Sequence, residues 1–160
     1  MTDFEALLRL LARARVEFII VGGAAATVHG SSRLTQDLDI VYRRSTENLH
    51  QLAEALSPYH PYLRGAPVGL PFRLDAETLQ RGLNFTLVTD LGDLDLLGEI
   101  AGGGNFEALL GHAQPVEVYG AQCYVLGLER LIEVKRAAGR PKDFEAIAEL
   151  EKILEARESG

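Results

Sequence analysis

A short apolar run that ends in two glycines constrains the fold of this chain more than any other feature. Residues 18–23 read Phe-Ile-Ile-Val-Gly-Gly, which is typical of a short buried strand. Residues 24–30 predict a short helix that ends at Gly30, and residues 37–42, Asp-Leu-Asp-Ile-Val-Tyr, predict a second strand. A strand, a helix and a further strand in this order indicate an α/β fold in which the helix packs on a sheet.

The rest of the chain is expected to extend this sheet and to flank it with helices. Residues 57–82 hold several prolines and glycines and are expected to be irregular. Helices are predicted at about 2–15, 45–56, 105–112, 127–138 and 141–156, and hairpins at 83–100 and 116–126. The fold class that follows is α/β, of the α+β kind, with a small mixed sheet, flanking helices and a C-terminal helical pair.

Length and composition favour one compact domain. The chain has 160 residues, of which 47% are hydrophobic and 24% charged, as is usual for a globular protein. We expect a core of residues 1–126 with the helical pair of residues 127–160 packed on it. No apolar run approaches the ~20 residues of a membrane span, and a single cysteine, Cys123, excludes an internal disulfide. The N-terminus lacks the features of a signal peptide, so we expect a cytoplasmic protein that does not contact a membrane.

The net charge of −7 is concentrated in one part of the chain. Residues 82–126 contain six acidic residues and no Lys or Arg. An acidic protein binds nucleic acid poorly without a local basic patch, because non-specific affinity comes mostly from phosphate neutralisation. An acidic segment is also what a cation site requires.

Two aspartates in the second predicted strand are the first candidates for such a site. Successive side chains of a strand point to opposite faces, so Asp37 and Asp39 share one face while Leu38 and Ile40 face the core. Two ionised carboxylates this close repel each other unless a cation, an arginine or open water lies between them. Oxygen ligands at this spacing suit Mg²⁺ or Mn²⁺. The alternative is a solvent-facing edge strand that happens to carry two acids.

The two glycines before the predicted helix add a second observation. At Gly22 and Gly23 the missing Cβ would let a phosphate approach the backbone at the start of a helix. A glycine pair alone is weak support, because many turns between a strand and a helix need glycine for packing. It is neither a dinucleotide-binding fingerprint nor a Walker loop. Its combination with a paired-aspartate strand about fifteen residues later is more specific.

Residues 21–42, VGGAAATVHGSSRLTQDLDIVY, resemble the signature of the nucleotidyltransferase superfamily. The spacing of Arg33, Thr35 and Asp37 is closer to the small bacterial abortive-infection and toxin-type branch than to the minimal branch. The family takes a third carboxylate from a later strand, between hydrophobic residues. Asp95 matches this pattern, and Asp93, beside the Gly-containing turn, is the rival assignment.

The resemblance implies a set of functional residues and an activity. Catalytic and metal-binding roles would fall to Asp37, Asp39 and Asp95, and nucleotide-binding roles to Gly22, Gly23, Arg33, Thr35 and Lys135. The cofactor would be Mg²⁺ or Mn²⁺. The reaction would transfer a nucleoside monophosphate from an NTP to a hydroxyl of RNA, such as tRNA, or of protein. It would take place within a toxin–antitoxin-like system with a cognate antitoxin or toxin partner. The alternative is a non-catalytic nucleotide-binding or antitoxin-like module with the same fold.

Lys135 is a candidate on two grounds. It falls inside the apolar arc of the 127–138 helix, so its ammonium group must reach water, an acid or a phosphate. Relatives of the toxin type carry a lysine and an aspartate in this region, which implies a triphosphate ligand. Asp143 is the alternative partner for this lysine, and Arg140 and Lys142 are secondary phosphate candidates. His29, at the end of the short helix, is more typical of a capping residue than of a nucleotide contact.

Overall fold

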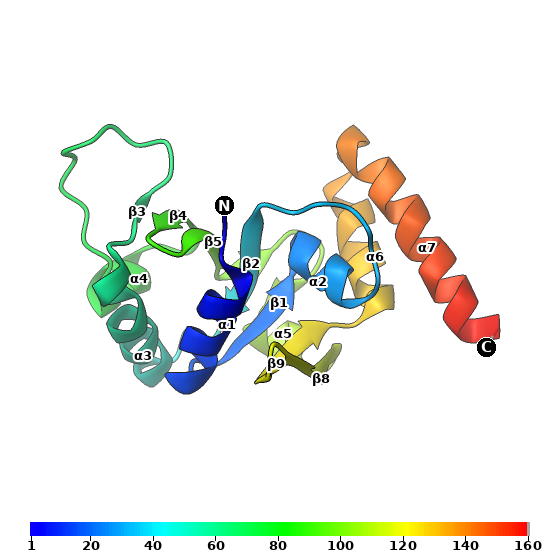
Figure 1. The fold of residues 1–160 in the computed structure, drawn as a ribbon, viewed down its shortest axis with the longest axis horizontal. Coiled ribbons are helices and arrows are strands. Elements are labelled where there is room, and N and C mark those ends of the chain that lie inside the picture. The colour runs from blue at the N-terminus through cyan, green and yellow to red at the C-terminus, as the bar shows by residue number, and fades with distance from the viewer. Residues whose placement is uncertain (160) are drawn as a thin grey trace.

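A seven-stranded mixed sheet forms the centre of this computed structural model, which describes residues 1–159 (Figure 1). The strands in spatial order are β3 (Tyr62–Leu63), β4 (Phe85–Thr89), β5 (Gly92–Leu97), β2 (Asp37–Tyr42), β1 (Phe18–Val21), β9 (Ala121–Leu126) and β8 (Ala113–Val118). The pairs β1–β9 and β2–β5 are parallel, and the other neighbours are antiparallel. The predicted α/β fold with a small mixed sheet is confirmed. Residue 160, the end of the predicted helical pair, lies outside the described residues.

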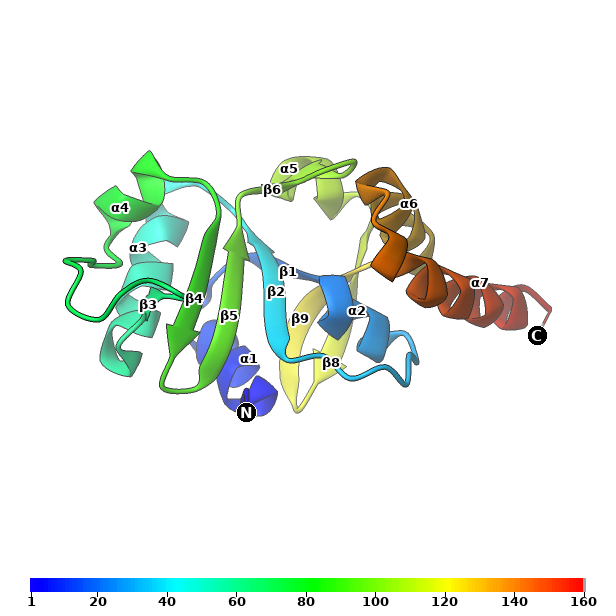
Figure 2. The same ribbon diagram turned by 90° about the horizontal axis from the view of Figure 1, so that it is seen from above.

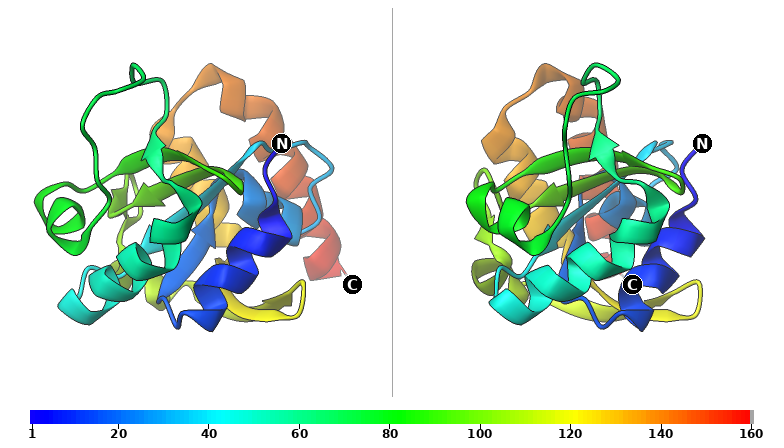
Figure 3. Two further views of the ribbon diagram at one scale, coloured as in Figure 1. Left: turned by 60° about the vertical axis from the view of Figure 1, so that its left-hand side comes forward. Right: turned by 90° about the vertical axis from the view of Figure 1, so that its left-hand side faces the viewer.

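Seven α-helices surround the sheet within residues 1–159. They are α1 (Phe4–Arg13), α2 (Gly22–Val28), α3 (Thr46–Leu56), α4 (Ala76–Arg81), α5 (Phe106–Leu110), α6 (Leu128–Ala138) and α7 (Phe144–Ser159). Figure 3 shows α1 and α3 side by side on one face of the sheet. Figure 2 looks onto the opposite face, where α2 lies over β1 and β9 and leaves β4 and β5 in view. None of the helices in these residues has the length and apolar character needed to cross a membrane.

Side-chain alternation separates the core from the polar face of the sheet. In β2, Leu38 and Ile40 are fully buried, while Asp37 and Asp39 are only partly buried on the other side. The apolar side of the sheet packs against α1 and α3 through fully buried leucines, which are Leu7, Leu11, Leu52 and Leu56. Burial of each such side chain contributes about 1.5–3 kcal/mol to folding. The prediction that the two acids share one face is therefore confirmed.

The start of α3 is set by local hydrogen bonds. Ser45 is the N-cap, and its side chain accepts a bond of 3.3 Å from the Asn48 amide. Asn48 is itself buried, and its side chain accepts from the Glu17 amide at 2.7 Å. It also donates to the carbonyls of Glu17 and Arg43, so one side chain joins the residues that flank β1 and β2.

Two predicted boundaries differ from the structure. The first strand ends at Val21, and both glycines belong to α2, with Gly22 at a φ of +63°. The segment 57–82 contains the 3₁₀ turn η1 (Ser57–Tyr59), β3 and α4 where an irregular region was expected. β3 forms by pairing with β4, a tertiary contact that leaves no local pattern. The start of α4 carried a readable signal, because Asp75 caps it by accepting from the Thr78 amide at 2.8 Å.

The last helix holds the segment that leads into β2. Glu149 of α7 accepts hydrogen bonds from Ser31 and Ser32, and Arg157 donates to the ring Nδ1 of His29 at 3.1 Å. The ring of His29 is buried, and its Nε2 donates to the Leu126 carbonyl at 2.7 Å. The expectation that His29 is structural agrees with these bonds. Between α6 and α7 lies a second 3₁₀ turn, η2 (Pro141–Asp143).

Candidate metal centre

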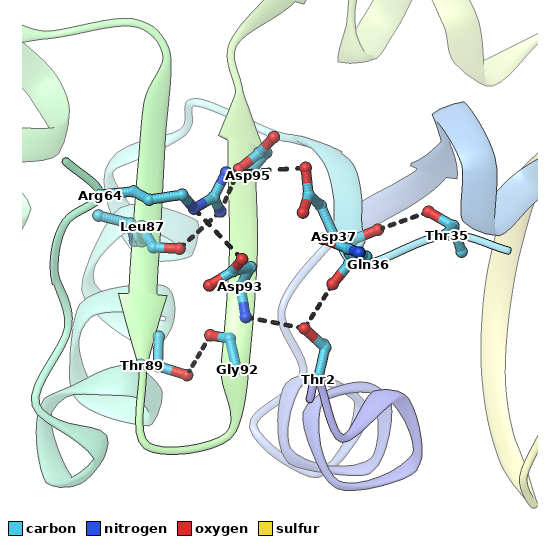
Figure 4. A network of polar contacts seen from close by, with 10 residues as sticks. All are labelled: Thr2, Thr35, Gln36, Asp37, Arg64, Leu87, Thr89, Gly92, Asp93 and Asp95. Atoms are coloured by element: carbon cyan, nitrogen blue, oxygen red, sulfur yellow. Dashed lines mark hydrogen bonds and ion pairs between the residues drawn. The ribbon is translucent and has the colours of Figure 1, made fainter.

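Four carboxylates lie on the polar face of the sheet, on two adjacent parallel strands. Asp37 of β2 is the register partner of Asp93 of β5 (Figure 4). Asp39 is the register partner of Asp95. Neighbouring strands are about 4.8 Å apart, so same-face side chains of register partners lie close together. One carboxylate oxygen from each of Asp37, Asp39 and Asp95 lies within 4.8 Å of the others. The structure thus brings the three predicted acids together and leaves Asp93 outside this group.

Asp39 carries a buried oxygen atom, Oδ1, that has no hydrogen-bond partner within residues 1–159. Burial, together with the negative charge of Asp95, raises the pKa of Asp39 from 3.8 to about 7. Burial and Asp95 also raise the pKa of Asp37. The protein therefore holds these carboxylates where their ionised forms are unfavourable unless a cation joins them.

This arrangement fits a small divalent cation. The three donors are all carboxylate oxygens, which are the ligands that Mg²⁺ and Mn²⁺ prefer. A bound ion would give the unpartnered Asp39 Oδ1 a ligand and would offset the repulsion of Asp39 with Asp37 and Asp95. A partly exposed site also leaves room for water or substrate oxygens, which Mg²⁺ normally retains.

Arg64 is a member of the site that sequence reasoning missed. Its Nη2 donates to Asp95 Oδ1 at 2.7 Å, and its Nη1 lies 3.7 Å from Asp37 Oδ2. Its Nε lies 3.5 Å from Asp93 Oδ2. An arginine was one of the groups that could separate the paired acids. Nothing in the local pattern singles out this one, because it follows a two-residue strand in a segment without periodicity.

Both glycines at the start of α2 have close neighbours in the site. A Cβ on Gly22 would collide with Asp39 Oδ2, and a Cβ on Gly23 would lie 2.5 Å from Thr35 Oγ1. Thr35 in turn donates to the Asp37 carbonyl at 3.3 Å. Gly22 and Gly23 thus have a packing reason to be glycine, and Gly22 lies directly beside Asp39. Contact with a phosphate remains a prediction for these residues.

The N-terminus also reaches the edge of this site. Thr2 Oγ1 donates to the Gln36 carbonyl and accepts from the Asp93 amide at 3.0 Å (Figure 4). Gly92, at a φ of +112°, has no room for a side chain because Thr2 packs against it. These bonds tie the start of β5 to the residue before β2. Sequence reasoning did not identify this contact.

In the described part of the chain, the two predicted cationic ligands, Arg33 and Lys135, form no ion pair with the acids of the cluster. Arg33 forms an exposed ion pair of 3.5 Å with Glu145 of α7. Lys135 is half-buried on α6 and forms no ion pair within residues 1–159. The suggested alternative, a pair between Lys135 and Asp143, is wrong. Arg140 precedes the η2 turn, and Asp143 ends it. The turn brings Nε of Arg140 to 2.7 Å from the buried carboxylate of Asp143.

Comparisons with known proteins identify the fold. No family profile matches the chain, and no curated protein matches it in sequence. A candidate nucleotidyltransferase from Thermotoga maritima superposes with a TM-score of 0.55 at 16% identity, covering 95% of this chain and 96% of that one. An antigenic nucleotidyltransferase-like protein from Paracoccidioides brasiliensis superposes with a TM-score of 0.57 at 16% identity, covering 95% of this chain and 73% of that one. The predicted nucleotidyltransferase-like fold is therefore confirmed.

Proposed function

We propose that this chain is a metal-dependent nucleotidyltransferase, which transfers a nucleoside monophosphate from an NTP to a hydroxyl group and releases pyrophosphate. One observation carries the proposal: three carboxylates converge from adjacent parallel strands on a nucleotidyltransferase-like fold, next to the two glycines that begin α2. Asp37, Asp39 and Asp95 would hold Mg²⁺ or Mn²⁺. A bound divalent ion supplies neutralisation of phosphate charge and activation of a coordinated hydroxyl.

The residues of the chain would mainly position the reactants. The acceptor oxygen attacks the α-phosphorus, a new P–O bond forms, and the bond from the α-phosphorus to the bridging oxygen breaks, with pyrophosphate as the leaving group. Asp95 would accept the hydroxyl proton as a general base. Gly22 and Gly23, without Cβ atoms, would let the triphosphate approach the backbone next to Asp39. By family resemblance, Thr35, with Arg33 and Lys135, would complete the nucleotide site.

The acceptor and the cellular setting follow from the resemblance of residues 21–42 to the toxin-type branch. We propose a hydroxyl of RNA, such as tRNA, or of protein as the acceptor, in the cytoplasm of a bacterium. The enzyme would act in a toxin–antitoxin-like system with a cognate partner protein. Residues 1–126 would form the catalytic core, with the C-terminal helical pair as a unit packed on it.

A transfer assay tests the proposal. Each of the four NTPs, labelled at the α-phosphate, is incubated with the protein, Mg²⁺ or Mn²⁺, and either total cellular RNA or lysate. We expect a labelled acceptor and pyrophosphate with the wild type and none with Asp39→Ala. Asp90→Ala is the matched control, because it removes an exposed acid from the β4–β5 turn, outside the cluster. Absence of both products from the wild type in every combination would count against the proposed activity.

A specific observation favours a second candidate, a non-catalytic nucleotide-binding or antitoxin-like module. Arg64 already contacts Asp37, Asp93 and Asp95, so these acids have a cationic partner without a metal ion. Such a module would bind an NTP or a partner protein and would release no pyrophosphate. Nucleotide binding without product in the transfer assay would favour this function.

A further inference from the structure

One guanidinium lies among the acids at the proposed metal centre. Two of its three ion-pair partners, Asp37 and Asp95, are candidate metal ligands, and the third is Asp93. The contact with Asp95 is a hydrogen bond of 2.7 Å, whereas the other two are longer, at 3.7 and 3.5 Å. Figure 4 shows the Arg64 side chain reaching across β4 to these carboxylates on β5 and β2. Arg64 thus occupies the position where a cation is needed.

Some of the polar atoms of Arg64 form hydrogen bonds with the sheet, and one does not. Its backbone amide donates to the Thr86 carbonyl at 2.9 Å, and its Nη2 donates to the Leu87 carbonyl at 2.7 Å. Its Nε, by contrast, is buried and makes no hydrogen bond within residues 1–159. The guanidinium therefore satisfies only part of its hydrogen-bonding capacity in this position, and an incompletely satisfied group is less costly to displace.

The surroundings of Arg64 allow its side chain to move without disturbance of the core. Arg64 directly follows the edge strand β3, and its side chain is 30% exposed. Residues 64–75 then arch away from the sheet before α4 (Figure 1). Gly65, at a φ of +83°, has open space around it, and Val68 is fully exposed. If the Arg64 side chain changed rotamer toward the protruding segment 64–75, it would therefore enter solvent.

A divalent ion and the guanidinium of Arg64 would compete for the same carboxylates, Asp37 and Asp95. Asp95 Oδ1 already accepts a charge-assisted hydrogen bond, and a positive charge within about 4 Å of an ion opposes its binding. We propose that Arg64 is a resident cation of the metal-free protein, and that a divalent ion binds at Asp37, Asp39 and Asp95 only by displacing it from Asp95. This inference rests on the proposed function, because it takes these three acids as metal ligands. Arg64 would thus stabilise the site in the absence of metal, and a higher metal concentration would be needed to fill the site.

A titration with Mn²⁺ alone, without nucleotide, tests the competition on the full chain. Arg64→Gln removes the charge and keeps a polar side chain, and we expect it to bind Mn²⁺ roughly tenfold more tightly than the wild type. Arg73→Gln is the matched control, since Arg73 lies in the same protruding segment, is 89% exposed and contacts none of the four acids. It should bind Mn²⁺ like the wild type. Arg64→Lys keeps the charge and should remain close to wild-type affinity.

The wild-type protein provides a second readout that does not depend on a variant folding. The arginine Nε–H signals are followed by NMR in ¹⁵N-labelled protein while Mg²⁺ is added, with the Arg64 signal assigned through Arg64→Lys. Displacement predicts that the Arg64 signal moves as the site fills, while the Arg73 signal does not. An Arg64 signal that stays in place while Mg²⁺ binds would overturn the inference.

The outcomes separate this inference from the proposed function. Equal Mn²⁺ affinity in the wild type and Arg64→Gln, or weaker binding in the variant, would overturn the competition and leave the metal site standing. Weaker binding would mean that Arg64 supports the site by orienting Asp95. If Asp39→Ala binds Mn²⁺ as well as the wild type, or if neither the wild type nor any variant binds it, the metal site itself fails and both proposals fall together.

Discussion

Asp39 and Asp95 are register partners on β2 and β5, two adjacent parallel strands. Because the strands are in register, both carboxylates project from the same face at the spacing of neighbouring strands. Burial of Asp39 and the nearby negative charge of Asp95 both raise the cost of ionising Asp39. This pair is the centre of the proposed site. The protonation of Asp39 should therefore make the free energy of unfolding of the metal-free protein depend on pH.

The first prediction concerns pH. The pKa of Asp39 is raised from 3.8 to about 7, by burial and then by Asp95, while Asp37 opposes its ionisation and Arg64 favours it. Between these two pH values the folded state binds a proton that the unfolded state has lost. The free energy of unfolding should therefore fall as pH rises, by at most about 1.4 kcal/mol per pH unit from this group. Urea unfolding in EDTA at pH 5 and pH 8 measures the fall.

Asp39→Asn is the control for this pH dependence. The asparagine cannot titrate, so its stability should depend less on pH than that of the wild type. His29 acts in the opposite direction, because burial lowers its pKa and its folded state resists protonation at acid pH. The difference between the wild type and Asp39→Asn isolates the carboxylate from the histidine. Parallel pH profiles in the two proteins would show that Asp39 titrates normally.

The second prediction compares two glycines with nearly equal, positive φ angles. Gly22 has a φ of +63° and Gly139 a φ of +64°. A Cβ at Gly139 meets no atom closer than 3.9 Å. Gly139→Ala should therefore lower the free energy of unfolding only by the cost of placing a Cβ on a left-handed backbone, about 1–2 kcal/mol. Gly22→Ala adds a collision with Asp39 and should cost roughly 1–3 kcal/mol more. Thermal melts of the two variants give the comparison, and equal losses would mean that Asp39 moves aside freely.

The third prediction separates the roles of Arg140 and Lys135, two of the basic residues in the C-terminal pair. Asp143 is buried and its partner is Arg140, so Arg140→Gln should destabilise the protein by about 1–3 kcal/mol. Lys135→Met keeps the packing of the side-chain stem and removes no ion pair, so it should leave the melting temperature nearly unchanged. If Lys135 binds the triphosphate, the same change weakens NTP binding by about 1.5–3 kcal/mol. Unchanged NTP affinity in Lys135→Met would remove this residue from the nucleotide site.

Local patterns predicted much of the fold and part of the site. Strand alternation placed Asp37 and Asp39 on one face, and turn residues located both hairpins, because these signals depend only on neighbours in sequence. The positive φ of Tyr119 and Gly120 shows why the second hairpin turns where it does. The choice of Asp95 over Asp93 came from a family resemblance, and the parallel register of β2 with β5 brings Asp95 into the cluster.

The rest of the site depends on contacts that no local pattern encodes. Arg64 reaches the acids only because β3 pairs with β4, and a two-residue strand has no periodicity to recognise. The bonds of Thr2 to Gln36 and to Asp93 likewise join residues that are 34 and 91 positions apart in the sequence. The pair of Arg140 with Asp143 is local, and the proline that opens the η2 turn between them was a usable signal for it.

The fourth prediction separates catalysis from nucleotide binding. Asp95→Asn keeps the shape of the side chain and removes the proposed base, so nucleotide binding should largely persist. The rate of transfer should fall by at least roughly two decades, which is the usual scale for a missing general base. Pyrophosphate release by the wild type and the variant, measured at saturating NTP, gives the ratio. Similar rates would exclude Asp95 from the chemical step.

The most direct test of the central claim is a calorimetric titration of NTP into the wild type and Asp39→Ala, with and without Mn²⁺. The claim is that Asp37, Asp39 and Asp95 form one divalent-metal site that serves a nucleotide. We expect Mn²⁺ to raise the affinity of the wild type for NTP. In Asp39→Ala, whose fold should be intact and slightly more stable without metal, Mn²⁺ should have no effect. Equal and metal-independent NTP binding in both proteins would contradict the claim.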